Sequence, residues 1–194
     1  MQFFYTLTSP YARKCHIILH INGLIEQTEL VITDQFAEDF RQINPLGKIP
    51  SLRTEDLILM DSPLICEYLD DKGQSDLFKK GSAQYYHIQQ AHVLANGIID
   101  AAVATVYEKR RDSEPSQKWL TRWNETLHSS LSQLSTQHLG SPTDINIASV
   151  AMVTALAYLD FRLSELPWRE WNPTVADWYN PFTELTWFDR TQPQ

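Results

Sequence analysis

A serine followed by a proline stands near the N-terminus, where the chain changes from a strand-like to a helix-like segment. Residues 1–6 are rich in aromatic side chains, which predicts a strand, and Ser9-Pro10 is a typical helix start. Free N–H groups and a partial positive charge gather at a helix start, and they would stabilise a thiolate there. No histidine–aspartate relay accompanies Ser9, so we interpret it as an O–H donor to a sulfur anion or as a plain N-cap.

The segment 44–52 contains two prolines and a glycine and ends in residues typical of a strand start. We predict a cis peptide bond at Ile49-Pro50, although an ordinary loop with a trans proline is the commoner state. A bend at this point would leave the N–H and C=O of Ile49 without a ladder partner. An extended peptide could then pair with Ile49 as an added strand.

A second helix start of the same kind occurs at Asp61-Ser62-Pro63. Ser62 and its backbone N–H suit a carboxylate ligand, and the carboxylate of Asp61 suits an ammonium group. The alternative is a capping turn with no ligand. Lys48 precedes Ile49 and could pair with a ligand carboxylate, or it could be an ordinary solvated lysine.

Two histidines and two cysteines are the other residues with possible chemistry. His16 and His20 have the i, i+4 spacing of a helical metal site, but no third ligand is evident. We expect both to lie at the surface among Arg13 and Lys14. Cys15 and Cys66 form no Cys-x-x-Cys pair and are predicted to be buried packing residues in a protein of the reducing cytosol.

The elements that must position these residues fall into two groups. Strands are expected at 1–6, 27–32, 49–53 and 57–60, with helices at 10–22 and 62–72 and a short helix or turn within 36–43. A strand, a helix and a strand in this order imply a parallel pair with a right-handed crossover. Beyond residue 82 strand signals stop, and helices are expected at 83–111, 113–139, 144–166 and 173–183. Thr143 with Asn146 predicts a capping box at the third of these.

A polar stripe runs along the long helix expected at 83–111. It is either a solvent-facing surface or one wall of a pocket, and its members are Gln89, His92, Asn96, Asp100 and Tyr107. The same helix carries more apolar residues than one core face needs, including Ile99 and Val103.

Composition narrows the possible partners. The 194 residues are 43% hydrophobic and 21% charged, with a net charge of −8, as in an ordinary globular protein. No basic run exceeds the short segment 109–111, which argues against nucleic acid and anionic membranes as partners. The longest nearly apolar run, 147–159, is shorter than the ~20 residues of a membrane span. No signal peptide is expected at the N-terminus.

Together, the motifs at 9–14 (SPYARK), 44–50 (NPLGKIP) and 61–69 (DSPLICEYL) resemble those of the cytosolic glutathione transferases, in particular serine-type, bacterial-like members. The segment 143–151 is similar as well, although Asn146 replaces the usual Asp, and Asp61 stands where many members have Glu. The resemblance covers the whole chain. It implies an α/β thioredoxin-like N-terminal domain at 1–76 that binds glutathione. It also implies an all-α C-terminal domain at 83–194 with an electrophile pocket and dimer contacts.

The resemblance also assigns roles to residues. It implies that Ser9 is catalytic and that glutathione is a co-substrate bound at the domain boundary, with no metal or tightly bound cofactor. Glutathione contacts are expected from Lys48, Ile49, Pro50, Asp61 and Ser62, and possible acceptor-pocket or glutathione contacts from Tyr11, Asn96, Asp100 and Tyr107. A cytoplasmic homodimer that detoxifies small hydrophobic electrophiles is implied, without nucleic acid or membrane partners.

Two other functions fit the same fold. A thiol–disulfide exchange enzyme or a glutathione-dependent peroxidase is one, although an exchange enzyme would favour Cys at position 9, where this chain has Ser. A non-catalytic interaction or regulatory protein is the other, because a fold does not fix a function. The complete set of site motifs favours the transferase, and the sequence does not identify the electrophile.

Overall fold

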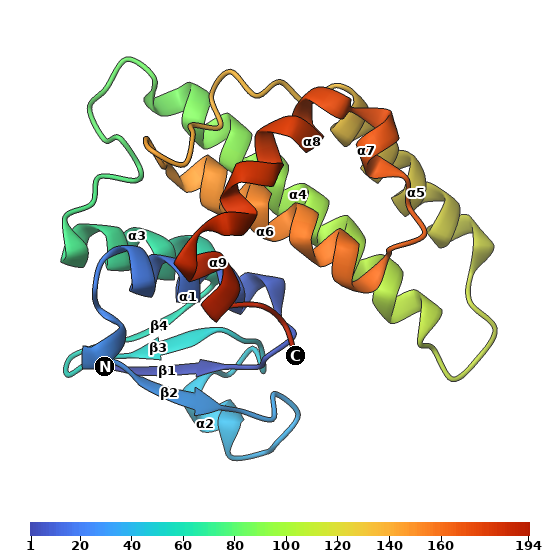
Figure 1. Cartoon of the computed structure of the whole chain (residues 1–194). Helices are drawn as coiled ribbons and strands as arrows, with labels where there is room; N and C mark the ends of the chain where they lie inside the picture. The colour runs from blue at the N-terminus through green and yellow to red at the C-terminus, as the bar shows by residue number, and fades with distance from the viewer. The chain divides into compact units, whose positions relative to one another are not determined.

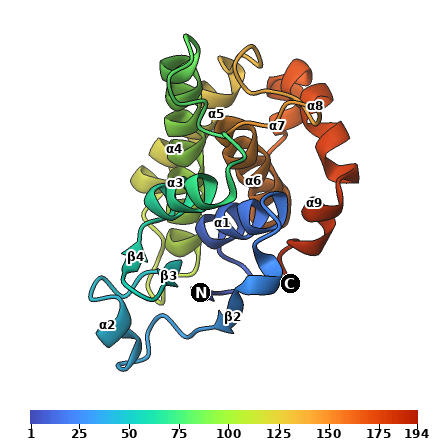
Figure 2. The ribbon, with the colours of Figure 1, turned by 90° about the vertical axis from the view of Figure 1, so that its left-hand side faces the viewer.

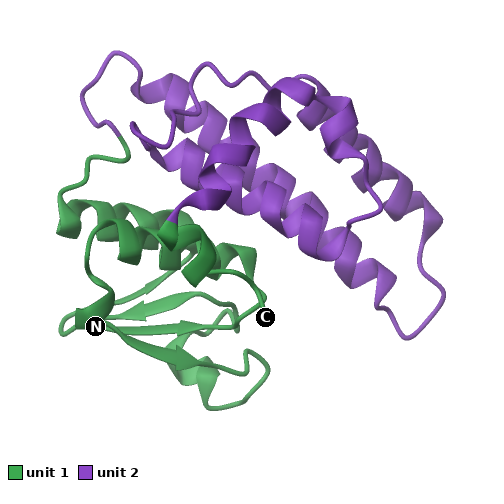
Figure 3. Ribbon diagram, viewed as in Figure 1, with its two compact units in different colours: residues 1–78, 186–194 green, residues 79–185 purple.

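The computed structural model describes residues 1–194 and contains two compact units (Figure 3). The first unit comprises Met1–Phe78 and Thr186–Gln194, and the second comprises Lys79–Leu185. The first contains the sheet and the second is helical, which confirms the predicted fold class.

A four-stranded sheet forms the centre of the first unit, with strand order β2-β1-β3-β4. The strands are β1 (Gln2–Tyr5), β2 (Glu29–Ile32), β3 (Ser51–Arg53) and β4 (Ile58–Met60). β1 pairs in parallel with β2 and antiparallel with β3, and β3 pairs antiparallel with β4. This topology is the βαβ and ββα arrangement that the sequence predicts.

Helices cover both faces of this sheet. α1 (Pro10–Ile21) and α3 (Ser62–Gly73) lie on one face, and the short α2 (Phe40–Ile43) lies on the other (Figure 1). Side chains alternate between the faces of a strand, so the neighbours Phe3 and Phe4 enter different parts of the core. Phe4 packs with Phe40 and Ile49. A short 3-10 helix, η1 (Ile25–Gln27), follows α1.

The C-terminal segment with α9 (Thr186–Arg190) packs in the first unit, against α1. The Arg13 side chain donates from Nη2 to the Phe188 carbonyl at 3.1 Å and from Nε to Thr191 Oγ1 at 3.3 Å. The guanidinium also lies 4.7 Å from the centroid of the Phe188 ring. Residues 186–194 therefore belong to the first unit and not to the expected C-terminal domain at 83–194. The reason is that a buried arginine near the opposite end of the sequence anchors them.

The second unit consists of helices alone. They are α4 (Tyr85–Lys109), α5 (Gln117–Ser132), α6 (Ile147–Arg162), α7 (Trp168–Trp171), α8 (Pro173–Tyr179) and the 3-10 helix η2 (Asn180–Glu184). α4 packs against both α5 and α6 (Figure 2). Every residue of α6 from Ile147 to Leu159 is buried, which explains its almost uniformly apolar sequence. None of the helices has both the length and the hydropathy of a membrane span.

The start of α6 corrects one sequence prediction. The N-cap is Asn146 rather than Thr143, so the helix begins three residues later than expected. Asn146 Oδ1 accepts from the Ser149 N–H at 3.0 Å, and the Asn146 N–H donates to Ser149 Oγ at 2.8 Å. This is a reciprocal capping box with Asn at the cap and Ser at its third helical position. The helix expected at 173–183 is α8 followed by η2, and neither α7 nor α9 was predicted.

Candidate active site

The strand register brings three predicted site segments to one end of the sheet. Phe4 in β1 is opposite Ser51, the first residue of β3, and Ser51 is opposite Met60, the last residue of β4. The chain therefore leaves β1 toward Ser9, enters β3 from Pro50 and leaves β4 toward Asp61, all at the same end of the sheet. Three segments distant in sequence thus converge here.

Ser9 is the N-cap of α1, as the sequence predicts. Its backbone is extended, with φ −76° and ψ 120°, and its Oγ accepts a hydrogen bond from the Ala12 N–H at 3.2 Å. Pro10 follows in the first turn, where its missing N–H costs nothing. Because Oγ accepts in this bond, its own proton is available for donation to a ligand. The N-cap and donor interpretations are therefore compatible.

Asn44 organises the loop that leads to the cis proline. Its side chain is fully buried, and its amide donates to the Lys48 carbonyl at 2.6 Å and to Ser51 Oγ at 3.0 Å. Asn44 Oδ1 accepts from the Leu46 N–H at 3.0 Å. No role was predicted for Asn44 from the sequence. Asparagine before a turn commonly bonds the backbone two residues on, so its signal was present in the sequence.

The Ile49-Pro50 peptide bond is cis, as predicted. Ile49 lies two residues before Ser51, the first residue of β3. Its side chain packs with Phe4 and Phe40, and its N–H and C=O have no hydrogen-bond partner in the chain. The side chain is therefore fixed in the core while the backbone polar groups stay available. Lys48 is exposed.

Asp61 and Ser62 start α3 in a way that the capping alternative does not explain. Asp61 has φ 73° and ψ 126°, which non-glycine residues rarely adopt, and its side chain makes no capping hydrogen bond. Ser62 is only 2% exposed, and its Oγ has no hydrogen-bond partner. A buried hydroxyl without a partner is unusual, because its desolvation costs about 1–3 kcal/mol. A ligand polar group at the start of α3 would remove this cost.

The two cysteines lie between α1 and α3, directly behind Ser62. Cys15 and Cys66 are both fully buried, with their Sγ atoms 3.6 Å apart, and Cys15 Sγ lies 3.6 Å from the Ser62 carbonyl. Burial, followed by the neighbouring Cys66 thiol, raises the pKa of the Cys15 thiol well above its ordinary value. This protonated thiol fits the predicted packing role. Lys14, expected at the surface, is also fully buried.

The remaining predicted contacts lie on two helices. Tyr11 is half-buried in the first turn of α1, in the first unit. Asn96, Asp100 and Tyr107 lie on α4 of the second unit, where Asn96 is half-buried and the other two are exposed. His92 is only 3% exposed, so the polar stripe is not uniformly solvent-facing.

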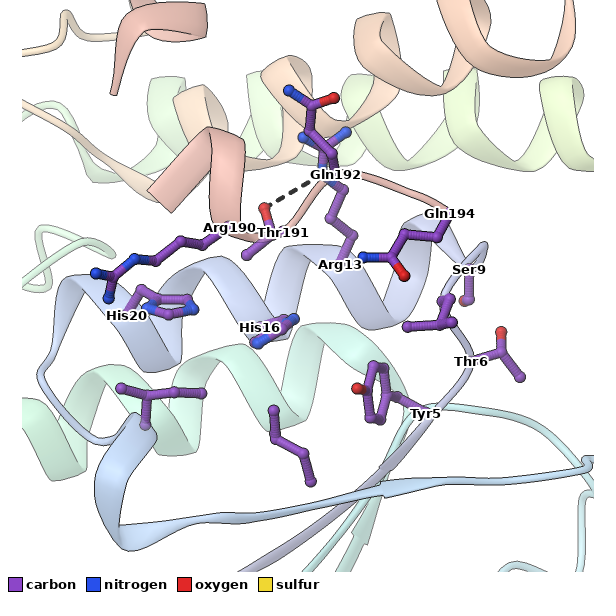
Figure 4. A pocket seen from close by; sticks show the side chains of 13 residues that line it. Tyr5, Thr6, Ser9, Arg13, His16, His20, Arg190, Thr191, Gln192 and Gln194 are labelled. Carbon is purple, nitrogen blue, oxygen red and sulfur yellow. Dashed lines mark hydrogen bonds between the residues drawn. The ribbon is translucent and has the colours of Figure 1, made fainter. Parts of the chain in front are cut away.

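The outer face of α1 lines a cavity in the first unit. The cavity has a volume of about 360 Å³, and its walls include Arg13, His16 and His20 from α1 and Arg190 from α9 (Figure 4). The prediction that Arg13 and the two histidines lie at the surface is therefore wrong: Arg13 is 7% exposed and the histidines are half-buried. The cause is the C-terminal segment, which covers this face of α1. No group of three or more potential metal ligands is present.

Known proteins resemble this chain over its full length. Residues 8–72 match the family model described as glutathione S-transferase, N-terminal domain. A crystal structure of a glutathione transferase family member from Pseudomonas fluorescens Pf-5, with bound glutathione, is 30% identical and has a TM-score of 0.92. The match covers 100% of this chain and 98% of that protein.

Two curated proteins extend this similarity. An uncharacterized GST-like protein, YibF of Escherichia coli, is 29% identical over 96% of this chain and 95% of its own length. Glutathione S-transferase Z1 of Arabidopsis thaliana is 26% identical over 96% of this chain and 88% of its own length. With a matching fold, a matching N-terminal family model and full-length relatives, the chain belongs to the glutathione transferase family.

Proposed function

We propose that this protein is a glutathione transferase that conjugates the glutathione thiolate to a small hydrophobic electrophile. The observation that carries the proposal is the convergence of Ser9, Ile49-Pro50 and Asp61-Ser62 at one end of the sheet. Each offers a polar group for a ligand: the Ser9 hydroxyl, the Ile49 backbone and the buried Ser62 Oγ. The glutathione bound to the Pseudomonas fluorescens relative supports the same co-substrate.

The three parts of glutathione match these groups in kind. Its γ-glutamyl carboxylate would accept from Ser62 and the start of α3, and its ammonium group would pair with Asp61. Its cysteine backbone would pair with the N–H and C=O of Ile49 as a short added strand beside Pro50. Lys48 is exposed and would pair with the glycyl carboxylate.

Catalysis would then depend on lowering the pKa of the bound thiol and holding it against the electrophile. Ser9 would donate to the sulfur, and the N-terminus of α1 would favour the thiolate over the thiol. Positioning lowers the barrier further, because the two reactants need no longer meet by diffusion. Tyr11, Asn96, Asp100 and Tyr107 are the candidates for additional contacts with the acceptor or glutathione.

Binding and turnover assays test this function separately. Retention on a glutathione-affinity column, followed by turnover in a screen of aryl halides, epoxides, hydroperoxides and unsaturated carbonyls, is the expected result. Retention without turnover would favour a non-catalytic interaction or regulatory protein. Turnover of hydroperoxides alone would favour a peroxidase. A cytoplasmic location and a role in detoxification belong to the same proposal.

Replacement of both Asp61 and Ser62 by alanine should weaken glutathione binding at least about tenfold, ~1.4 kcal/mol. The reason is the loss of both partners of the γ-glutamyl end. Asp61 makes no capping hydrogen bond, and removal of the unpartnered Ser62 hydroxyl offsets the added strain of alanine at the positive φ of position 61, so the thermal stability of the ligand-free protein should change little. Calorimetry measures the affinity, and thermal unfolding provides the control. An unchanged affinity would mean that these residues only shape the start of α3.

We also expect a homodimer, on the basis of family membership. Of the two apolar residues of α4 that suggested the dimer, Ile99 is fully buried within the chain itself, and Val103 is half-buried. Val93 and Tyr86 on α4 are exposed, at 66% and 82%. Sedimentation at micromolar concentration should give twice the mass of one chain. A single-chain mass under these conditions would contradict the expectation.

A further inference from the structure

The cavity on the outer face of α1 lies in the first unit. Of the residues proposed to contact glutathione, only Ser9, at the edge of the cavity, lines it. α1 supplies Arg13, His16 and His20, and α9 supplies Arg190 (Figure 4). Its walls contain four basic side chains and no acidic one. A partly open cavity of this composition favours anions, because the apolar parts of its walls strengthen the field of each cation.

The basic side chains differ in how firmly they are held. Arg13 is fixed by its bonds to the Phe188 carbonyl and Thr191 Oγ1, so its charge is a permanent part of the cavity. Arg190 is exposed and forms no salt bridge. The carboxylate of Asp189, the neighbour of Arg190 on α9, accepts from Gln192 Nε2 at 3.4 Å. Arg190 therefore has no ion-pair partner that a ligand must displace.

Burial and the neighbouring basic groups together act on the two histidines of the cavity. Burial, then His20 and Arg13, lower the pKa of His16 to about 4. Burial, then Arg190, lower the pKa of His20, and Glu26 opposes this effect only in part. Both imidazoles are therefore neutral near pH 7, and a bound anion would favour their protonated forms.

Aromatic rings form one wall of the same cavity. The ring centroids of Tyr5 and His16 are 5.7 Å apart, and those of His16 and His20 are 5.1 Å apart. Figure 4 shows His16 between Tyr5 and His20 along α1. Ile25 and Leu30 add aliphatic surface. A flat aromatic ligand would bury its apolar surface against this wall. A simple inorganic anion has no such surface, so the wall would not stabilise it.

We propose that this cavity is a second binding site, which takes a small aromatic carboxylate with its anionic end beside Arg190 and His20. The aromatic body lies against the row of rings and the aliphatic side chains. This site shares only Ser9, at its edge, with the proposed glutathione contacts, and it does not depend on that proposed function.

Calorimetry with benzoate, in the absence of glutathione, tests the site. Benzoate should bind with a dissociation constant near or below about 1 mM, as expected for a ligand of this size in a favourable site. Benzamide keeps the ring without the charge, and acetate keeps the charge without the ring, so each should bind at least about tenfold more weakly. Equal binding of benzoate and benzamide, or no detectable binding of benzoate, would overturn the proposal.

Substitutions locate the bound benzoate. Arg190→Gln should weaken it about three- to tenfold, and the double variant with His20→Gln should lose at least about tenfold. Lys72→Gln, at the end of α3, removes one exposed charge outside the cavity and should leave the affinity unchanged. Thermal unfolding of each variant checks that the fold is retained. If Arg190→Gln had no effect and glutathione displaced benzoate, the benzoate would lie in the glutathione site, which overturns this proposal but not the proposed function.

The pH dependence gives a readout that general charge screening would not produce. Benzoate affinity should rise as the pH falls from about 7.5 to about 5.5, because the bound anion raises the pKa of His20 and a proton is taken up. His20→Gln should flatten this profile. A pH-independent affinity of the parent protein would contradict the placement of the anion beside His20.

Discussion

Replacing Ser9 with alanine should lower turnover near neutral pH by roughly ten- to a hundredfold. A hydrogen bond to a charged group contributes ~1.5–3 kcal/mol, and ~1.36 kcal/mol corresponds to one pH unit. The pKa of the bound glutathione thiol should therefore rise by roughly one to two pH units, limited by what the N-terminus of α1 still supplies. Ultraviolet absorbance of the thiolate against pH, for the parent and Ser9→Ala complexes, measures this change.

The pH profile separates this role from capping. Below the thiol pKa the rate follows the thiolate fraction, so the variant is slower there, and at high pH the two proteins should converge. Glutathione affinity at a pH where the thiol stays protonated should hardly change, because Ser9 is expected to touch only the sulfur. Ser9→Ala also removes the bond to the Ala12 N–H and should cost ~1 kcal/mol of stability, whereas Ser9→Thr keeps both the cap and the hydroxyl. Overlapping titration curves would reduce Ser9 to an N-cap and make Tyr5, Thr8 and Tyr11 the next candidates.

Asn44→Ala should lower both the stability of the protein and its affinity for glutathione. It leaves the Ser51 hydroxyl without its partner in a buried position, and the Lys48 carbonyl and the Leu46 N–H without theirs in partly buried positions. The expected loss of stability is about 2–4 kcal/mol. Because the same loop presents Ile49, glutathione affinity should also fall at least about tenfold. Chemical denaturation and calorimetry measure the two effects.

Asn172 provides a matched control in the second unit. Its amide donates to the Leu131 carbonyl at 2.9 Å and the Leu134 carbonyl at 3.0 Å, and its Oδ1 accepts from the Val175 N–H at 3.2 Å. Asn172→Ala therefore removes the same kinds of bond, and it should lower stability without a direct effect on glutathione binding. If both variants lowered glutathione affinity equally under conditions where each is folded, the effect of Asn44 would be general destabilisation rather than loop positioning.

Local signals in the sequence predicted much of the site. Ser9-Pro10 encodes a helix start in two adjacent residues, and the first helix begins there. The alternation of apolar residues and the turn signals predicted four strands and the parallel pairing of the first two. Parts of the site that follow from local rules, such as the N-cap at Ser9 and the bend at Pro50, could therefore be predicted from the sequence.

Other features depend on contacts that no local pattern contains. The positive φ of Asp61 was not predicted, because residues other than glycine seldom adopt it and no local sequence signal marks it. The burial of Arg13 depends on Phe188 and Thr191, which are far away in sequence. The start of α6 was misplaced because Thr143 and Asn146 are both good caps, and tertiary contacts select between them.

The anchoring of α9 on α1 has a consequence for how the protein is made. A ribosome releases Arg13 175 residues before Phe188 and 178 residues before Thr191, the two residues that hold its side chain. While the second unit is being synthesised, the nascent first unit therefore exposes a face of α1 that the C-terminal segment covers in the folded protein. Domains usually fold in the order in which they are synthesised, yet here the first unit is completed only after the whole second unit has emerged.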